Sequence, residues 1–275
     1  MQRHPFCFQK DIAESLTQQS QFGEVGKPPK KHMTKHTTEW YASWFDSPFY
    51  HILYKDRDYA EAQQFMDNLT QYLNVPEGGS ILDLACGKGR HSVYLNTLGY
   101  DVTGVDLSAN SIAHAKQFEN ETLHFAVHDM CKPYKQQFDA VFNLFTSFGY
   151  FENEEDNLNT IKAIKADLNE FGFGVIDFMN SEYVIDNLVA ENVKTVEGIA
   201  FTQKRRVENG YIIKEISFTV DGEDFNFQER VRGFTIADFK ALFEQAGVYL
   251  LDVFGDYKLH KFDAKQSERL IMIFK

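Results

Sequence analysis

The feature that most constrains the fold of this chain is a short apolar run that ends in a glycine-rich turn and leads directly into a helical pattern. The run covers residues 80–84, the turn residues 85–89, and the helical pattern residues 90–98. Gly87 and Gly89 have no Cβ atom, so the backbone of the turn can come close to a bound ligand. A strand, a glycine turn and a helix in this order place that ligand at the helix N-terminus. The pattern therefore predicts an α/β fold with a ligand site at the end of a strand.

An acidic residue at the end of the next strand narrows the class of ligand. Residues 102–105 form the second strand pattern, and Asp106 follows them, 17 residues after Gly89. A carboxylate at this place can accept hydrogen bonds from both hydroxyls of a ribose. The dinucleotide fingerprint has Gly or Ala three residues after Gly89, where this chain has Ser92. The pattern favours a nucleoside cofactor without a pyrophosphate, and Ser108 is the predicted N-cap of the next helix.

The following part of the chain continues the alternation of strands and helices. A helix over residues 157–168, a turn at 171–174 and a buried strand over 175–178 predict a parallel sheet with helices on both faces. The last elements of this core are expected to be a capped helix and two strands, at residues 235–247, 249–254 and 270–274.

Between these parts the pattern changes to three strand-like runs that are joined by dipeptides typical of hairpin turns. The runs are residues 200–207, 211–220 and 225–232, and the turns are Asn209-Gly210 and Asp221-Gly222. We expect an antiparallel insertion over residues 181–232 that lies over the active site at the carboxyl edge of the main sheet. Its seven basic and ten acidic residues favour the wall of a pocket over a surface that grips RNA.

From residue 38 to residue 275 the chain resembles the class I S-adenosylmethionine-dependent methyltransferases. Residues 81–90 are similar to the first motif of that family, 105–108 to its second, 128–130 to its adenine-binding segment and 138–145 to its fourth-strand motif. The resemblance implies a Rossmann-like, seven-stranded methyltransferase sheet with helices on both faces. It also implies S-adenosylmethionine as cofactor and S-adenosylhomocysteine as product.

The same resemblance implies roles for individual residues in cofactor binding. Asp83 would lie near the amino group of the cofactor, and Asp106 would bind the ribose. Asp129 would take the amino group of the adenine, while the backbone of Met130 contacts the ring. The other cofactor-binding positions implied by these motifs are Ala85, Gly87, Gly89, Arg90, Leu107, Asn143, Leu144 and Phe145.

A closer resemblance is to the small-molecule branch that includes amino-sugar N-methyltransferases. Their Tyr-x-x-x-Tyr-x-x-Arg-like segment is matched by Tyr50, Tyr54 and Arg57, which the resemblance assigns to the cofactor site. Their Phe-Ser-Ser-x-Gly-Tyr element is matched by residues 145–150, with Thr146 in place of a serine. The substitution keeps a hydroxyl group. The identity of the acceptor does not follow from the resemblance.

Aromatic residues are concentrated between residues 38 and 59, and an amphipathic helical pattern follows over residues 62–73. These segments form either part of the ordinary core or a cap that is folded over the ligand. As a cap they would exclude water and attract the cationic methyl donor to their aromatic faces. The aromatic residues proposed for this cap are Tyr41, Trp44, Tyr50 and Tyr54.

The candidates for a direct part in the reaction are few, because methyl transfer mainly requires alignment of donor and acceptor. An amine acceptor must be uncharged to attack, so a nearby base helps. His51 in the aromatic segment and His260 before the last strand are the candidates for that base. Tyr150 and Tyr257 are candidates for the pocket lining. Each of the four has a plain alternative as a surface or packing residue.

Composition excludes several other classes of protein. The net charge of −12 argues against a general nucleic-acid binder, and no apolar run approaches the ~20 residues that span a bilayer. Three widely spaced cysteines predict neither a disulfide framework nor a metal site and fit a cytoplasmic protein. Residues 1–37 are polar and net basic, and we expect a disordered extension in which residues 1–32 are dispensable and translation can begin at Met33.

The predicted organisation is therefore four segments. These are the extension 1–37, the cap helices and cofactor core 38–180, the insertion 181–232 and the C-terminal completion of the sheet 233–275. The predicted function is transfer of a methyl group from S-adenosylmethionine to a small-molecule acceptor by in-line displacement. The alternatives are a methyltransferase acting on RNA or protein, a non-catalytic cofactor-binding module and an NAD-dependent oxidoreductase. Whether nitrogen, oxygen or carbon is methylated stays open, and a homodimer is one option for the assembly.

Overall fold

The computed structural model describes residues 44–45, 47–55 and 59–275. Three predictions fall on residues outside this part of the chain. They concern the polar extension 1–37, the cap residue Tyr41 and the cofactor-site residue Arg57. No helix within the described ranges is long and apolar enough to cross a membrane.

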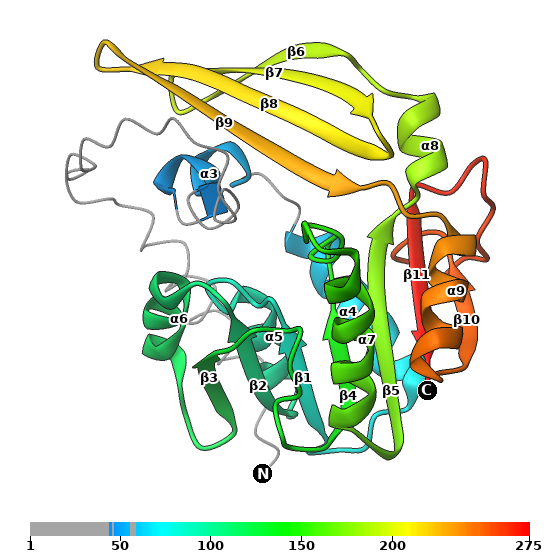
Figure 1. Ribbon diagram of the computed structural model, residues 1–275. Coiled ribbons are helices and arrows are strands. Elements are labelled where there is room, and N and C mark those ends of the chain that lie inside the picture. The colour runs from blue at the N-terminus through cyan, green and yellow to red at the C-terminus, as the bar shows by residue number, and fades with distance from the viewer. Residues whose placement is uncertain (1–43, 46, 56–58) are drawn as a thin grey trace. The chain divides into compact units, whose positions relative to one another are not determined.

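A seven-stranded sheet forms the centre of the protein, with the strand order β10-β11-β5-β4-β1-β2-β3 (Figure 1). Its strands are β1 Ser80–Leu84, β2 Asp101–Asp106, β3 Leu123–Val127, β4 Phe138–Asn143, β5 Leu168–Met179, β10 Leu250–Phe254 and β11 Arg269–Phe274. Strands β1 to β5 are parallel, and β11 is antiparallel to both of its neighbours. Strand β1 lies between β2 and β4, so the order of connection reverses there. Open α/β sheets bind ligands at such a switch point, at the carboxyl ends of the strands.

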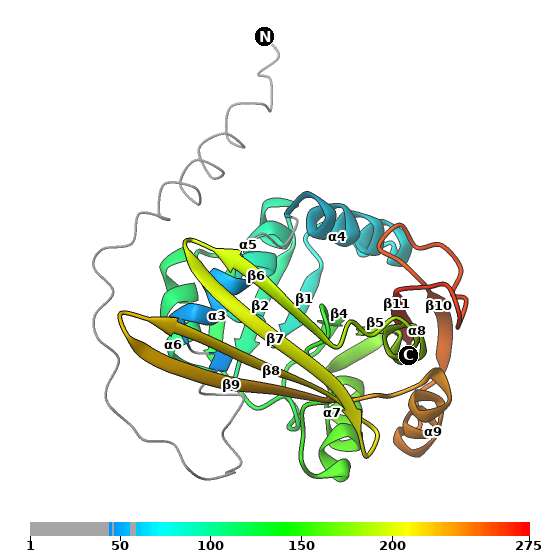
Figure 2. The ribbon, with the colours of Figure 1, turned by 90° about the horizontal axis from the view of Figure 1, so that it is seen from above.

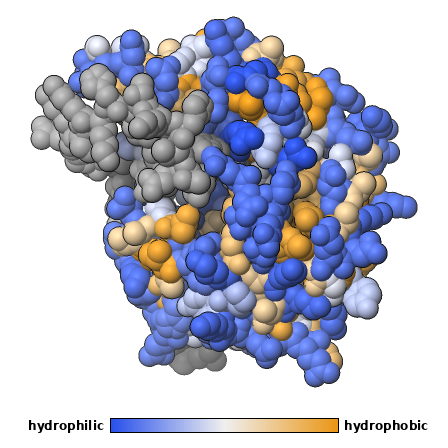
Figure 3. Space-filling model, in the orientation of Figure 1, coloured by the Kyte–Doolittle hydropathy of each residue, from blue (hydrophilic) through white to orange (hydrophobic). Residues whose placement is uncertain are grey.

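Helices cover both faces of this sheet, as predicted. They are α4 Tyr59–Leu73, α5 Arg90–Thr97, α6 Ala109–Ala115, α7 Glu154–Asp167 and α9 Ile236–Ala246, with a short 3-10 turn η2 Lys116–Phe118 after α6. Figure 2 shows α4 and α5 on the side opposite to α7 and α9. Successive residues of a strand point to opposite faces. Ile81 therefore packs in the core under α4, α5 and α6, while the neighbouring Leu82 packs in the core under α7 and α9. The surface seen in Figure 3 is mainly hydrophilic, with hydrophobic residues in scattered patches.

A separate four-stranded antiparallel sheet has the order β6-β7-β8-β9. It consists of β6 Glu191–Val196, β7 Ile199–Glu208, β8 Tyr211–Val220 and β9 Glu223–Arg232, and helix α8 Ser181–Asp186 leads into it. Helix α3 Pro48–Leu53 packs against it, and Trp44 and Phe49 share a core with Phe201 and Phe218 (Figure 1). The aromatic segment is therefore both a core element and a layer between this sheet and the rest of the protein.

Local signals placed the ends of several elements correctly. Ser108 caps α6 by accepting a hydrogen bond from Ser111 N, and Thr235 forms a capping box at the start of α9. Gly247 ends α9 with a φ of 68°. The two predicted hairpin turns have positive φ at both residues, as tight turns of this kind require, at Asn209, Gly210, Asp221 and Gly222.

One local prediction was wrong, and one strand was not predicted. The turn expected at residues 171–174 is part of the continuous strand β5. Glycine is needed there because the neighbouring strands approach closely: a Cβ at Gly174 would lie 2.5 Å from the Phe274 ring, and one at Gly172 would lie 2.6 Å from the Phe138 carbonyl oxygen. Strand β6 was missed because it is a short edge strand with a mostly exposed, polar pattern.

Candidate functional site

Gly87 and Gly89 in the turn between β1 and α5 are needed for different structural reasons. Ala85, Gly87 and Gly89 all have positive φ values, at 63°, 57° and 80°. A Cβ at Gly89 would lie 2.6 Å from the Phe125 ring, so glycine is required there for packing. A Cβ at Gly87 would meet no atom within 4 Å and would project into open space. The backbone at Gly87 is thus the part of the turn that a ligand can approach.

Asp106 ends β2 directly beside this turn. One carboxylate oxygen accepts a hydrogen bond from Gly87 N at 2.9 Å, and the other accepts one from Ser108 N at 2.8 Å. These bonds fix the half-buried carboxylate between the turn and the start of α6. A carboxylate has about four lone-pair positions, so each oxygen can still accept a further hydrogen bond.

Two large apolar side chains are exposed next to Asp106, at the ends of neighbouring strands. Leu107 is 53% exposed and Val127 is 54% exposed, and Val127 pairs with Asp106 across β2 and β3. Asp129 lies just beyond Val127. Burial raises the pKa of Asp129, but the hydrogen bond from Cys131 N and the charge of Lys132 outweigh this effect and hold the pKa below its ordinary value. An apolar surface beside a carboxylate suits a flat heteroaromatic ring with a polar edge.

Asp83 lies on β1, the strand that pairs with β2, and is almost fully buried. Its carboxylate accepts a 2.6 Å hydrogen bond from Ser92 Oγ. Burial raises the pKa of Asp83 to about 6, and the charge of Asp106 adds to this effect. A cation close to this carboxylate would favour its ionised form.

Asn143 ends β4 at the switch point of the sheet. Its side-chain Nδ2 donates to Leu84 O at 3.2 Å and lies 3.7 Å from Met130 Sδ. Its buried Oδ1 has no hydrogen-bond partner within the described part of the chain. An unpaired buried acceptor costs about 1–3 kcal/mol, so a donor supplied by a ligand would be favoured here.

The segment after β4 turns back over the glycine turn. Phe145 is half-buried, and its ring stacks on His91 with 4.3 Å between ring centroids. It also lies 5.7 Å from the Tyr257 ring, which in turn packs at 4.5 Å on Phe65 of α4. Phe145 therefore links the first helix after the glycine turn to the loop between β10 and β11. Arg90, in contrast, points to the start of α4, with its guanidinium 4.5 Å from the Tyr59 ring centroid.

The aromatic residues of the segment 44–54 form one cluster. Tyr50 lies 4.9 Å from Tyr54, 5.6 Å from Trp44 and 5.1 Å from Phe45, measured between ring centroids. Phe45 lies 5.6 Å from Tyr150 in the segment after β4. The cluster thus connects the four-stranded sheet to the candidate site.

The hydroxyl of Tyr54 is turned toward the four-stranded sheet, where a polar group of four residues meets. Glu229 Oε1 accepts hydrogen bonds from Tyr54 Oη at 2.7 Å and from Trp44 Nε1 at 2.8 Å. Lys214 donates to the Tyr54 hydroxyl and lies 3.6 Å from Glu229 Oε2. The assignment of Tyr50 and Tyr54 to the cofactor remains a prediction, and this polar contact was not expected from the sequence.

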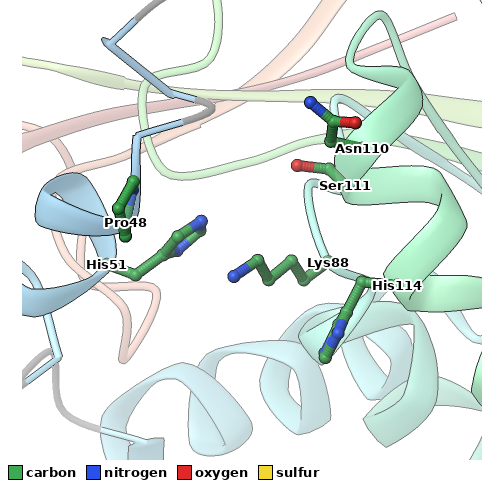
Figure 4. A pocket seen from close by; sticks show the side chains of 6 residues that line it. All are labelled: Pro48, His51, Lys88, Asn110, Ser111 and His114. Carbon is green, nitrogen blue, oxygen red and sulfur yellow. The ribbon is translucent and has the colours of Figure 1, made fainter. Parts of the chain in front are cut away.

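His51 lines a cavity of about 310 Å³ between α3, the glycine turn and α6. Figure 4 shows His51 and Lys88 pointing toward each other from opposite walls. The full lining is Pro48, His51, Lys88, Asn110, Ser111 and His114. Tyr257 lines a second cavity, of about 620 Å³, at the loop between β10 and β11. The His260 side chain is 72% exposed and forms a 2.7 Å contact with Asp256, and it lines neither of these two cavities.

An ion pair between Asp177 on β5 and Arg269 on β11 was not predicted from the sequence. Arg269 Nε donates to Asp177 Oδ1 at 2.8 Å, and Asp177 is fully buried. Burial raises the pKa of Asp177, and the charge of Arg269 opposes this effect. The signal that could have found the pair is a lone charged residue inside or beside an otherwise apolar strand. Within the described ranges, no group of three or more side chains could hold a metal ion.

The fold and this site define an α/β protein with carboxylates, an open glycine turn and exposed apolar side chains at the carboxyl edge of a seven-stranded sheet. The sequence profile described as a methyltransferase domain matches residues 81–172. The chain is also similar to YqeM of Bacillus subtilis (strain 168), which carries a methyltransferase name, with 30% identity over 220 residues, 74% of this chain and 87% of YqeM. The chain belongs to the class I S-adenosylmethionine-dependent methyltransferases and is an enzyme that uses S-adenosylmethionine as cofactor.

Other relatives and solved structures agree with this family. Glycine/sarcosine N-methyltransferase of Halorhodospira halochloris is 27% identical over 263 residues, which are 91% of this chain and 93% of that one. The crystal structure of an S-adenosylmethionine-dependent methyltransferase from Clostridium acetobutylicum ATCC 824 has a TM-score of 0.70 at 22% identity, covering 86% of this chain and 97% of that one. CcbJ from Streptomyces caelestis has a TM-score of 0.69 at 15% identity, covering 84% and 97%. The last two comparisons show the shared fold.

Proposed function

We propose that this enzyme methylates a small-molecule amine. The observation that carries the cofactor half of the proposal is the pairing of Asp106 with the backbone of Gly87 beside an open space. The acceptor half is supported by relatives named for N-methylation, which include the Halorhodospira halochloris protein. Another is the dTDP-3-amino-3,4,6-trideoxy-alpha-D-glucopyranose N,N-dimethyltransferase of Streptomyces venezuelae, 28% identical over 206 residues, 70% of this chain and 85% of that one.

The residues at the carboxyl ends of the strands would hold the cofactor along the switch point. Asp106 would accept hydrogen bonds from the ribose hydroxyls, and Leu107 and Val127 would cover the adenine ring, which their positions beside the glycine turn support. Asp129 is proposed for the amino group of the adenine, and Asp83 for the ammonium group of the methionine part. When bound, the cofactor supplies an electrophilic methyl group on a sulfonium.

The protein's contribution to the transfer itself would be alignment and the exclusion of water. Phe145, Tyr150 and Tyr257 supply aromatic surface where the segment after β4 meets the loop between β10 and β11. His51, in the cavity beside the glycine turn, is our candidate for the base that receives a proton from the amine.

The chemistry of the whole chain supports a small acceptor. The net charge of −12 would repel a nucleic-acid backbone. Cys86 and Cys131 are free thiols, as a protein of the reducing cytoplasm would have. A homodimer is compatible with the proposal but is not required by it.

Calorimetric titration with S-adenosylhomocysteine tests the cofactor site. We expect Asp106→Ala to weaken binding by about 3 kcal/mol, roughly 100-fold, because two charge-assisted hydrogen bonds are lost. Asp139→Ala is the matched control, since Asp139 also accepts a backbone hydrogen bond, from Ser80 N at 2.7 Å, but at the amino end of the sheet. Equal affinity of the two variants would disprove the ribose assignment. Screening an amine library for release of S-adenosylhomocysteine would then identify the acceptor.

A further inference from the structure

The turn after β4 has an unfavourable backbone conformation. Phe145 has a φ of 57° and Thr146 a φ of 60°, and neither is glycine. The left-handed region is uncommon for such residues, and for a β-branched threonine it is a true outlier. Conformations of this kind persist only where the surrounding structure holds them, and they are concentrated at functional sites.

Two side chains from distant parts of the sequence hold this turn. Asp177 on β5 accepts a hydrogen bond from Phe145 N at 2.8 Å through Oδ2, and its backbone oxygen accepts one from Thr146 N at 3.0 Å. Arg269 on β11 contacts the other carboxylate oxygen with Nη2 at 2.7 Å. The same Nη2 donates to the Thr146 hydroxyl at 3.0 Å. Phe145 is therefore bound to the carboxylate of Asp177, and Thr146 is bound to the backbone oxygen of Asp177 and to the Arg269 guanidinium.

The same pair also reaches the loop between β10 and β11. The Tyr257 hydroxyl hydrogen-bonds to the Asp177 carboxylate, and the guanidinium of Arg269 lies 5.4 Å from the Tyr257 ring centroid. The rings of Phe145 and Tyr257 contact each other near the end of β4, and the Phe145 ring also stacks on His91 of α5. One buried ion pair thus sets the positions of both.

We propose that Asp177 and Arg269 are positioning residues that hold the strained turn at Phe145 and Thr146, together with Tyr257, in the arrangement that binds S-adenosylmethionine. The inference rests on the proposed cofactor site, because the turn matters only if the crevice beside it is used. An ion pair that served stability alone would not need to bind two residues with left-handed backbone. Replacing a buried pair with apolar residues is often neutral for stability, and a role of these charges beyond stability is part of the proposal.

The test compares Asp177→Asn with Asp167→Asn. Asp167 is likewise buried and accepts backbone hydrogen bonds, from Tyr134 N at 2.9 Å and Lys135 N at 3.3 Å, but it lies at the amino end of the sheet. Both substitutions should lower the melting temperature. We expect only Asp177→Asn to raise the Kd for S-adenosylhomocysteine, by tenfold or more, when both proteins are titrated far below their melting temperatures. An affinity of Asp177→Asn within twofold of the Asp167→Asn value would overturn the inference.

If Asp177→Asn does not fold, the smaller substitution Thr146→Val tests the same inference. Thr146→Val removes the hydroxyl that accepts from Arg269 and leaves the ion pair and both strands intact. We expect at least a threefold weaker affinity for S-adenosylhomocysteine with a nearly unchanged melting temperature, whereas Thr70→Val, which removes a helix-bound hydroxyl on α4, should change neither. Unchanged affinity in Thr146→Val would count against the inference. A wild-type protein that does not bind S-adenosylhomocysteine at all would instead refute the proposed function.

Discussion

Three carboxylates toward the carboxyl ends of parallel strands of the main sheet are held in three different ways. Asp106 is half-buried and accepts two backbone N–H groups. Asp177 is fully buried and paired with a guanidinium. Asp83 is buried and accepts its hydrogen bonds from Ser92, and burial dominates, so its pKa rises to about 6. The surroundings of each residue, and not the residue type, decide what its charge can do.

The raised pKa of Asp83 makes the stability of the cofactor-free protein depend on pH. The folded value of about 6 exceeds the ordinary 3.8, so between these values the folded state binds more protons than the unfolded state. The contribution to stability is complete below pH ~4 and is lost as pH rises through 6, on the order of 3 kcal/mol in all. Asp83→Asn should remove this slope, because the amide does not titrate and can still accept from Ser92.

Urea unfolding at a series of pH values, without cofactor, measures this difference. The quantity compared is the change in unfolding free energy between pH 4 and pH 7 in the two proteins, which cancels the contributions of the other titrating groups. Parallel pH profiles for the wild type and Asp83→Asn would show that Asp83 titrates normally.

At the scale of elements, one carboxylate of the four-stranded sheet binds several groups of the helical segment that carries α3. Glu229 on β9 is 16% exposed and binds Trp44 and Tyr54 on the helical segment and Lys214 on β8. The other face of the sheet carries ion pairs of a different kind. Arg206 and Glu215, for example, are 2.6 Å apart but 44% and 46% exposed. The inner group joins the sheet to the helical segment, whereas the pair of Arg206 and Glu215 joins two strands of the same sheet.

We predict that Glu229→Ala costs about 2 kcal/mol of unfolding free energy, because it leaves two donors and a half-buried ammonium group without their acceptor. Glu215→Ala removes a shorter ion pair from the same sheet but should cost under about 1 kcal/mol, since solvent screens it. Chemical denaturation of both variants provides the comparison. A larger loss in Glu215→Ala would contradict the structural account.

At the scale of the whole described molecule, the four-stranded sheet belongs to two different cores. Ile212 and Val231, at one end of it, pack with the core under α7 and α9. Phe201 and Phe218, toward the other end, pack with α3. The first core is continuous with the seven-stranded sheet, and the second depends on a single short helix. The two ends of the sheet therefore differ in how firmly they are held.

Hydrogen exchange should reveal this difference. Amides of β1, β4 and β5 lie in the middle of the main sheet with helices on both faces, so we expect them to exchange most slowly. Amides of α3 and of β6 should exchange faster, and S-adenosylhomocysteine should slow exchange in α3 if the aromatic cluster covers the cofactor site. Protection of β6 equal to that of β4, or no ligand effect on α3, would argue against this division.

Much of the candidate site could be predicted because its signals are local. Gly87, Gly89 and Asp106 lie within 20 residues of one another, and their spacing is tied to one strand, turn and helix. The contact between Asp177 and Arg269 spans 92 residues and has no local signal. The same holds for the bond between Tyr54 and Glu229, which spans 175 residues.

The amino-acid sequence by itself determined the features that depend on the backbone of a few adjacent residues: the glycine turn, the helix caps at Ser108 and Thr235, and the hairpin turns of the insertion. Tertiary structure alone decided which distant side chains meet. Apolar periodicity states which face of an element is buried, but it does not state what covers that face. For this reason Gly174 indicated a turn when it was read locally, and its true purpose, to make room for the Phe274 ring, became visible only once β5 and β11 lay side by side.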